Sequence, residues 1–315
     1  MAGSSKKVIY AALAGNALIA VTKFAAAAFT GSSAMFSEGI HSMVDTGNQV
    51  LLLHGIRRAR KPSSSRFPFG HGKEIYFWSF AVAILIFAVG SGVSLYEGII
   101  HTIHPKPIDK PLVNYIVLGL ALIFEGIAWF FAFNEFTKAK GKWGYIEAVQ
   151  RGKDPTMFVV LFEDSAAMLG IIVAFVGVLL VDKLGMMIFD GIASIIIGLI
   201  LGGTAVWLAY ETKGLLIGES ANETVVNGIR EIILKFEGID NINEVLTMHM
   251  GPDFILVNIS IDFRDDIPAG DLENIIAQID MQIKAGFPTV RRVFVEAESR
   301  RVLENAPDFL VYQKK

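Results

Sequence analysis

Six long apolar segments limit the possible folds of this chain more than any other feature. A helix needs about twenty mostly apolar residues to cross the hydrocarbon core of a bilayer. Segments of this kind occupy residues 8–30, 34–56, 77–100, 111–133, 156–181 and 187–210. Hydrophobic residues make up 53% of the chain, more than one soluble core needs. We therefore expect an α-helical membrane protein with six transmembrane helices.

The first segment is expected to be a retained helix rather than a signal peptide. It has a basic start followed by an apolar run, as a signal peptide would, but the run continues to Phe29. That length favours a first transmembrane span.

The second segment is the weakest of the six because polar residues interrupt it, namely Glu38, His41, Asp45, Asn48 and Gln49. We keep it because six spans place both termini on one side of the membrane. The loops after the second and fourth segments carry eleven Lys and Arg residues, whereas the opposite loops carry three. By the positive-inside rule, the basic loops and both termini are cytoplasmic. The expected location is the bacterial inner membrane.

After Tyr210 the composition changes to that of a small soluble domain. Apolar residues at helical spacing in "NETVVNGIREIILKF" predict a helix. The segments "INEVLTMHM" and "FILVNISIDF" predict two strands, followed by a helix over about 268–285 and a strand at "RRVFVEA". This αββαβ order predicts an α+β domain with helices on one face of an antiparallel sheet. The expected domains are 1–212 in the membrane and 213–300 in the cytoplasm, with a tail at 301–315.

Composition excludes several classes of function. The chain has no cysteine, so it has neither disulfides nor thiolate metal sites. Its formal net charge of −3 and the lack of a long basic face argue against a nucleic-acid partner. No nucleophile and base pair, phosphate-binding loop or cofactor motif is present, so we do not expect an enzyme or an organic cofactor.

The stretch "EGIHSMVDTGN" places ionisable residues inside the second apolar segment. His41 and Asp45 are four residues apart, so they lie on one face of a helix. An ionisable residue near the bilayer centre costs about 2.5–3.5 kcal/mol on insertion scales, and such residues usually pair or line a pathway. A divalent cation would compensate them directly, because imidazole and carboxylate are ligands for zinc and its first-row neighbours.

A second pair of acids lies in the fifth apolar segment. "VVLFEDSAAMLG" contains Glu163 and Asp164, which point about 100° apart on a helix, so Asp164 is the preferred ligand of the two. The alternative for such polar residues is hydrogen bonding between helices. That alternative applies most to Asn16, Ser37 and Asn48, which are also candidate hydrogen-bond partners of the ligands, and we expect Asp190 to cap the sixth helix.

These motifs resemble those of the cation diffusion facilitator family of divalent metal/proton antiporters. "GSSAMFSEGIHSMVDTGNQVLLL" is similar to that family's second span, "RFPFGHGKEI" to its second cytoplasmic loop and "FDGIASIIIGLIL" to its sixth span. The resemblance covers the chain to about Glu298. It implies a cytoplasmic domain like a ferredoxin or metallochaperone, and a homodimer in the lipid bilayer.

The resemblance also implies a transport site for a divalent cation. In the family this site takes HxxxD or DxxxD from the second span and HxxxD from the fifth. His41, Asp45 and Asp164 match, but Val160 stands where the family has a fourth ligand. The neighbouring Glu163 gives a Glu-Asp pair like that of the mitochondrial zinc-transporter-like branch. The expected metal ligands are therefore His41, Asp45, Asp164 and either Glu163 or water.

Other metal sites of the family are incomplete in this chain. In the second cytoplasmic loop only His71 matches, and we expect it to be a structural turn residue. In the soluble domain His249 is accompanied only by scattered acids, namely Glu273, Glu296 and Glu298. Lys73 matches a lysine that forms a salt bridge at the family's dimer junction, where Glu219 is the available acid.

The function implied by the resemblance is export of Zn²⁺ from the cytoplasm in exchange for protons. Ligands must lose their protons to bind a metal, which couples the two fluxes, and His41 is the expected proton carrier. One imidazole with two or three carboxylates is an oxygen-rich set that discriminates less against Mn²⁺ and Fe²⁺. The alternatives are efflux of Mn²⁺, Fe²⁺ or Co²⁺ by the same mechanism, or a metal-responsive membrane scaffold that does not transport.

Overall fold

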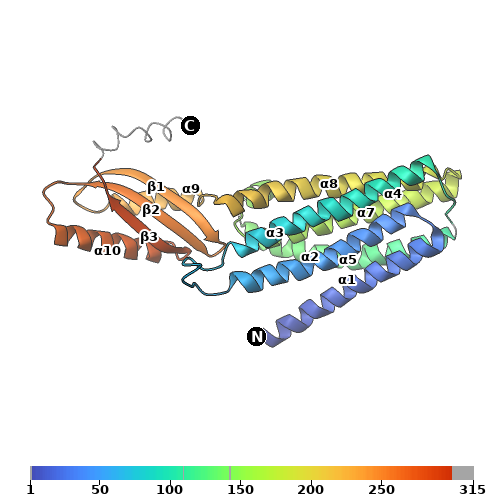
Figure 1. Ribbon diagram of the computed structural model, residues 1–315, viewed down its shortest axis with the longest axis horizontal. Coiled ribbons are helices and arrows are strands. Elements are labelled where there is room, and N and C mark those ends of the chain that lie inside the picture. Colours follow the sequence, from blue (N-terminus) through green and yellow to red (C-terminus); the bar gives the residue numbers. More distant parts are fainter. Residues whose placement is uncertain (1, 109, 142, 300–315) are drawn as a thin grey trace. The chain divides into compact units, whose positions relative to one another are not determined.

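The computed structural model describes residues 2–108, 110–141 and 143–299 (Figure 1). The chain forms two compact units, which are described separately below. The helical unit comprises Met1–Arg60 and Glu74–Lys213, and the C-terminal unit comprises Lys61–Lys73 and Gly214–Lys315. The loop at 61–73 therefore groups with the C-terminal unit, although both of its sequence neighbours are helices of the helical unit.

Long helices lying side by side make up the helical unit (Figure 1). They are α1 (Ala2–Thr30), α2 (Ser33–Ala59), α5 (Pro111–Lys140), α7 (Pro155–Leu184) and α8 (Ile188–Ile217), with a short α6 (Tyr145–Arg151) before α7. Another long helix runs from Glu74 to Ile103 and consists of α3 (Glu74–Leu85), a π-helical turn η1 (Ile86–Ser91) and α4 (Gly92–Ile103). Local sequence defines several helix ends. Ser32 caps α2 by accepting from the Met35 backbone N–H, and Gly185 ends α7 in the left-handed conformation.

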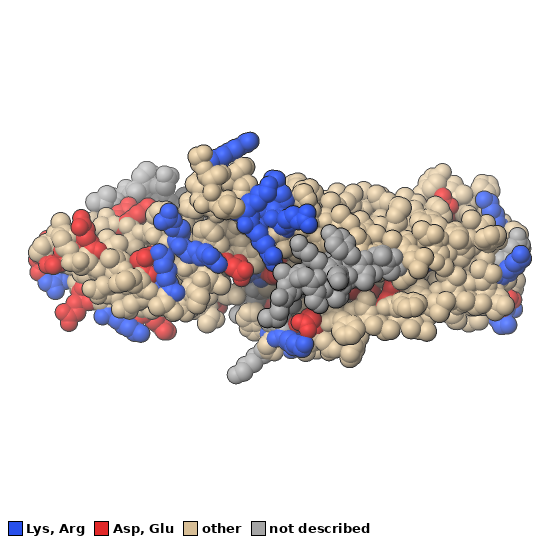
Figure 2. Space-filling model, turned by 90° about the horizontal axis from the view of Figure 1, so that it is seen from below, with Lys and Arg blue, Asp and Glu red and all other residues tan. Residues whose placement is uncertain are grey.

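The helical unit exposes many large apolar side chains and buries several charged ones. Large apolar side chains such as Leu112, Phe124 and Phe131 are exposed, whereas Lys23, Glu38 and other charged residues are buried. Figure 2 shows a largely uncharged surface over the middle of this unit. This inversion is that of an integral membrane protein, in which lipid replaces water around the apolar faces.

Four helices are long and apolar enough to cross a membrane within the described residues. They are Glu74–Ile103, Pro111–Lys138, Phe158–Leu184 and Ile188–Ile217. In α1 the apolar stretch Asn16–Thr30 is shorter, and α2 is not among the four. The number of spans expected from the sequence was six, and the two additional spans stay a prediction.

The C-terminal unit is a three-stranded sheet with both of its long helices on one face. Its elements are α9 (Glu223–Ile233), β1 (Ile239–Gly251), β2 (Phe254–Phe263), α10 (Ala269–Gly286) and β3 (Val290–Ala297). Alternate residues of β2, including Val257 and Ile259, are fully buried and share one core cluster with residues of both helices. Strand alternation places these residues on a single face, so the unit has two layers.

The sheet differs from the antiparallel one expected from the sequence. The strand order is β1-β2-β3, and β1 pairs antiparallel with β2, but β2 pairs parallel with β3. The reason is α10, which carries the chain back along the sheet before β3 begins. Parallel neighbours need such a crossover connection.

Helices α4 and α8 pack closely through small residues. On α8 these are Gly191, Ser194, Gly198 and Gly202, spaced three or four residues apart. The Ser194 hydroxyl donates to the Ser94 carbonyl oxygen at 2.9 Å. A Cβ atom added at Gly191 would lie 2.6 Å from the Thr102 backbone nitrogen, so this position accepts no side chain without a shift of the helices.

We expect Gly191→Ala to weaken this packing. The added methyl group would force α4 and α8 apart, and overpacking of this kind costs about 1–3 kcal/mol. The measurement is the melting temperature of the purified protein in detergent, which should fall. Gly203→Ala on the same helix is the matched control, because a Cβ atom there meets nothing within 4 Å. Equal melting temperatures for the two variants would contradict the close contact.

Candidate functional site

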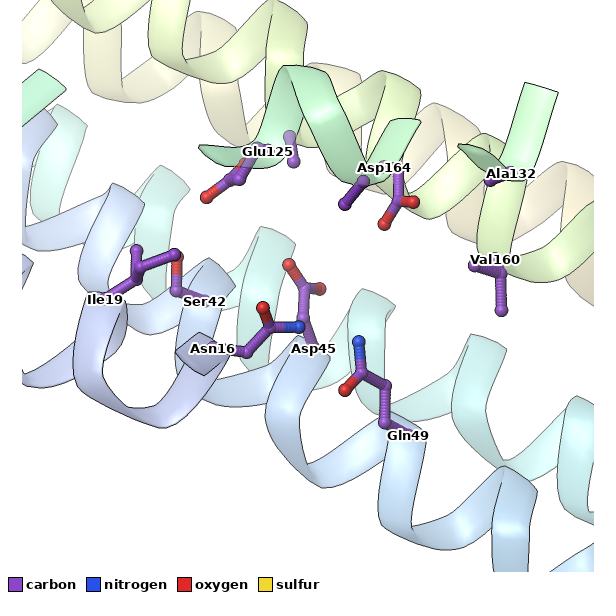
Figure 3. Close-up of a pocket in the computed structure, with 11 residues that line it drawn as sticks. Asn16, Ile19, Ser42, Asp45, Gln49, Glu125, Ala132, Val160 and Asp164 are labelled. Carbon is purple, nitrogen blue, oxygen red and sulfur yellow. The ribbon is translucent and has the colours of Figure 1, made fainter. Parts of the chain in front are cut away.

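A cavity of about 190 Å³ lies among α1, α2, α5 and α7 (Figure 3). It has room for a cation with several waters, since a water occupies about 30 Å³ in the liquid. Its lining combines polar and charged side chains with small apolar ones: Asn16, Ile19, Ser42, Asp45, Gln49, Glu125, Ala128, Ala132, Val160, Asp164 and Ala167. Figure 3 shows Asp45 pointing from α2 toward the helices that carry Glu125 and Asp164.

His41 and Asp45 come together on α2 as the four-residue spacing requires. The His41 Nε2 atom lies 3.4 Å from Asp45 Oδ2. Asp45 lines the cavity, whereas His41 is 1% exposed and is not among the lining residues. Neither ring nitrogen of His41 makes a hydrogen bond within the described residues. The imidazole is therefore buried beside the Asp45 carboxylate.

The two acids of α7 face different surroundings. Asp164 lines the cavity, but Glu163 does not. Glu163 is 4% exposed and accepts a hydrogen bond of 2.6 Å from the Asn48 amide on α2. The angle of about 100° between adjacent helical residues explains the difference.

The four predicted ligands are thus close neighbours but do not form a finished coordination sphere. Among the described residues, no three His, Asp or Glu side chains converge as they would around a bound metal ion. Val160 lines the cavity one turn before Asp164. At the position where the resemblance predicts a fourth ligand, the valine side chain therefore forms part of the cavity wall.

Sequence reasoning missed a group of charged residues beside this cavity. Lys23 on α1 donates to Glu38 on α2 and to Glu125 on α5, both at 2.9 Å. Lys23 and Glu125 are each a single charged residue within an apolar run, which is the signal that a buried pair or a pathway should be sought. Spacing along the sequence relates only charges that share a helix or stand next to each other, so it does not pair Lys23 with Glu125.

Comparison with known proteins identifies the family. Residues 9–217 match the cation efflux transmembrane domain. The chain belongs to the cation efflux family. Members of this family are transporters rather than enzymes. The match covers the helical unit, in which the cavity lies.

Several curated relatives are similar over most of this chain. The mitochondrial proton-coupled zinc antiporter SLC30A9 of Homo sapiens is 33% identical over 260 residues, 82% of this chain and 46% of the relative. Metal tolerance protein C4 of Arabidopsis thaliana is 28% identical, over 82% of this chain and 57% of the relative. The Escherichia coli cation-efflux pump FieF is 25% identical, over 88% of this chain and 87% of the relative.

These similarities place this cation efflux protein close to the mitochondrial zinc-transporter branch. The chain spans about half the length of the SLC30A9 relatives. It spans most of the length of FieF.

Asp190 has a different role from the one expected. Rather than capping its own helix, its carboxylate accepts from the Ser32 hydroxyl and from the backbone N–H groups of Ser33 and Ala34. It therefore caps the N-terminus of α2, the helix that carries His41 and Asp45. A spacing argument within one segment could not find a cap supplied by a helix more than 150 residues away.

The remaining polar candidates separate into two groups. Asn48 orients Glu163, and Asn16 lines the cavity. Ser37 instead makes a hydrogen bond with Ser194 of α8 and serves helix packing.

In the C-terminal unit, the residues considered above as remnants of family metal and salt-bridge sites take part in local contacts. The His249 ring is 4% exposed, with Nδ1 3.4 Å from the Gly251 carbonyl oxygen. The His71 ring contacts Phe67, and Lys73 Nζ lies 3.5 Å from Met248 Sδ. Glu298 accepts from the Ser260 hydroxyl at 2.9 Å, which is also a structural contact.

We expect Asp190→Ala to destabilise the start of α2. The substitution leaves two backbone N–H groups and one hydroxyl without their acceptor, and an unsatisfied buried donor costs about 1–3 kcal/mol. The melting temperature in detergent should fall, whereas Asp182→Ala on the more exposed end of α7 should change it little. A melting temperature for Asp190→Ala equal to that of the wild type would show that the cap is dispensable.

Proposed function

We propose that this cation efflux protein is a secondary active transporter that exports a divalent cation, with Zn²⁺ as first choice, from the cytoplasm in exchange for protons. The observation that carries the proposal is the cavity that Asp45 and Asp164 line from two different helices. Carboxylates at such depth are costly unless they serve a cargo or a partner. The SLC30A9 relatives are named proton-coupled zinc antiporters, which supports the same cargo and coupling.

In this proposal His41, Asp45 and Asp164 bind the cargo. The fourth ligand is either Glu163 or a water molecule. Imidazole and carboxylate ligands suit zinc. Imidazole and carboxylate ligands must lose their protons before they bind a metal, which supports the proton coupling. A metal ion that binds Asp45 would displace a proton held there. Protons and metal then compete for the same atoms.

The proposal includes six spans, cytoplasmic termini and assembly as a homodimer in the bacterial inner membrane. The long helices α1 and α2 supply the two spans that hydropathy alone does not identify. Asn16, Ser42 and Asp45 line the cavity, and Lys23 and Glu38 form a buried ion pair, so these polar residues lower the hydropathy of both helices. Alternating access would arise from helices rocking about the cavity, as in other secondary transporters.

Removal of the proposed ligands should abolish transport. In proteoliposomes with a pH gradient, His41→Ala, Asp45→Ala and Asp164→Asn are each expected to lower the zinc flux at least tenfold. Loss of one ligand weakens both metal binding and exchange. His54→Ala and Asp182→Asn are matched controls on the same two helices, at positions away from the cavity. Wild-type rates for both His41→Ala and Asp45→Ala would refute the site.

Val160→His should change the metal preference. Because Val160 lines the cavity one turn from Asp164, the new imidazole would face the cargo. A second nitrogen ligand favours Zn²⁺ over the harder Mn²⁺. The measurement is a competition panel of Zn²⁺, Mn²⁺, Fe²⁺, Co²⁺ and Cd²⁺ in proteoliposomes, with the Zn²⁺ to Mn²⁺ ratio expected to rise about tenfold. Absence of metal-driven proton flux with every metal, in the wild type and the variant, would favour the scaffold alternative.

A further inference from the structure

Lys23 forms a completely buried ion network beside the cavity. Its side chain is 0% exposed. The ammonium group donates to Glu38 Oε2, Ser42 Oγ and Glu125 Oε1, each at 2.9 Å. The three oxygen acceptors come from α2 and α5, and the lysine comes from α1. A cation in a pocket of oxygen atoms is therefore already part of the protein, at the wall of the proposed transport site.

The charges of this network do not balance within it. One ammonium faces two carboxylates, which leaves an excess of one negative charge when all three groups are ionised. Oε1 of Glu38 and Oε2 of Glu125 are buried and make no hydrogen bond within the described residues. A buried carboxylate oxygen without a partner is costly. One further cation would compensate that charge.

Only one of the two carboxylates faces the cavity. Glu38 is 0% exposed and is not among the lining residues, whereas Glu125 lines the cavity and is 15% exposed. Ser42, the third acceptor of the ammonium, also lines the cavity, three residues before Asp45 on α2. In Figure 3 Glu125 and Asp164 project from the two helices opposite Asp45. Glu125 is therefore the carboxylate of the network that lies at the cavity.

We propose that Glu125 is a third cargo-binding carboxylate of this cavity and that Lys23 is its resident counter-cation when the cavity is empty. The inference rests on the proposed transport function and deepens it. When a divalent cation enters, the unpartnered oxygen of Glu125 binds it, while the ammonium keeps Glu38 and Ser42. When the cargo leaves, Lys23 is again the cation beside Glu125, so that neither buried carboxylate is left without a positive partner. The cargo is then held mainly by oxygen atoms.

A purely structural ion pair is the competing explanation, because Lys23 also ties α1 to α2 and α5. Buried ion pairs of that kind act on stability, and loss of one partner is strongly destabilising. The two explanations predict different effects of substitutions in the ion network. A structural role changes the melting temperature but not the dissociation constant for metal, whereas a cargo role changes the dissociation constant in a direction set by charge.

Isosteric variants separate these explanations in the full-length protein. The measurement is the Kd for Zn²⁺ by titration calorimetry in detergent, with the melting temperature of each variant. Glu125→Gln keeps an oxygen for the ammonium but removes the charge, so the Kd should rise ten- to a hundredfold. Glu135→Gln is the matched control on the same helix, because Glu135 is exposed and pairs with Lys138. Its Kd should equal that of the wild type.

Two variants of the ion network test the role of Lys23 as counter-cation, because they are expected to change the Kd for Zn²⁺ in opposite directions. Lys23→Gln with Glu38→Gln removes one charge of each sign and leaves Glu125 without its ammonium, so the Kd should fall about tenfold. Glu38→Gln alone leaves the ammonium to Glu125, so the Kd should rise although Glu38 does not line the cavity. The single variant decides this role if the double variant does not fold.

The outcomes distinguish the inference from the proposed function. If wild-type protein binds and transports zinc, Asp45→Asn abolishes both, and Glu125→Gln has the wild-type Kd, then the inference is overturned and the transport site stands. An unchanged Kd in Glu38→Gln, or a higher Kd in the double variant, overturns the role of Lys23. If the wild type binds and transports none of the five metals, both proposals fail together.

Discussion

The burial of charge inside an apolar helix bundle is the constraint on which this structure depends. Lipid offers no hydrogen bonds, so each ionised group at depth must find a partner within the protein. Lys23 meets this requirement with carboxylates from two other helices, and Asp190 meets it by capping α2. These contacts link α1, α5 and α8 to α2. The helix with the lowest hydropathy therefore has polar contacts on several sides.

The sequence predicted the parts of the site that lie within one helix. His41 and Asp45 are one turn apart on α2, and the angle between Glu163 and Asp164 follows from helix geometry alone. Lys23 and Glu125 could not be paired in this way, because 102 residues separate them and helical periodicity carries no information about which helices are neighbours. For the same reason, the sequence alone predicts that Asp190 caps its own helix rather than α2.

In the C-terminal unit, local sequence patterns predicted helices and strands near 223–233, 254–263 and 269–286, where the structure has them. The sheet was expected to be antiparallel, and that was wrong. Strand direction depends on the path of the connection, and the long α10 between β2 and β3 permits a parallel pair. Nor does hydropathy indicate that the loop 61–73 groups with this unit. Gly72 makes that association possible, since a Cβ atom there would collide with the Met250 carbonyl oxygen.

The donor set of the cavity follows from the geometry of α7 and α5 together. Position 160 faces the cavity but holds valine, and Glu163, three residues further along α7, turns toward Asn48 instead. A side chain on α7 therefore does not replace the missing ligand without a change of rotamer or helix rotation. Glu125 lines the same cavity from α5. Loss of a nitrogen ligand on one helix and gain of a carboxylate on its neighbour would make the cavity more oxygen-rich, which shifts preference toward harder divalent cations.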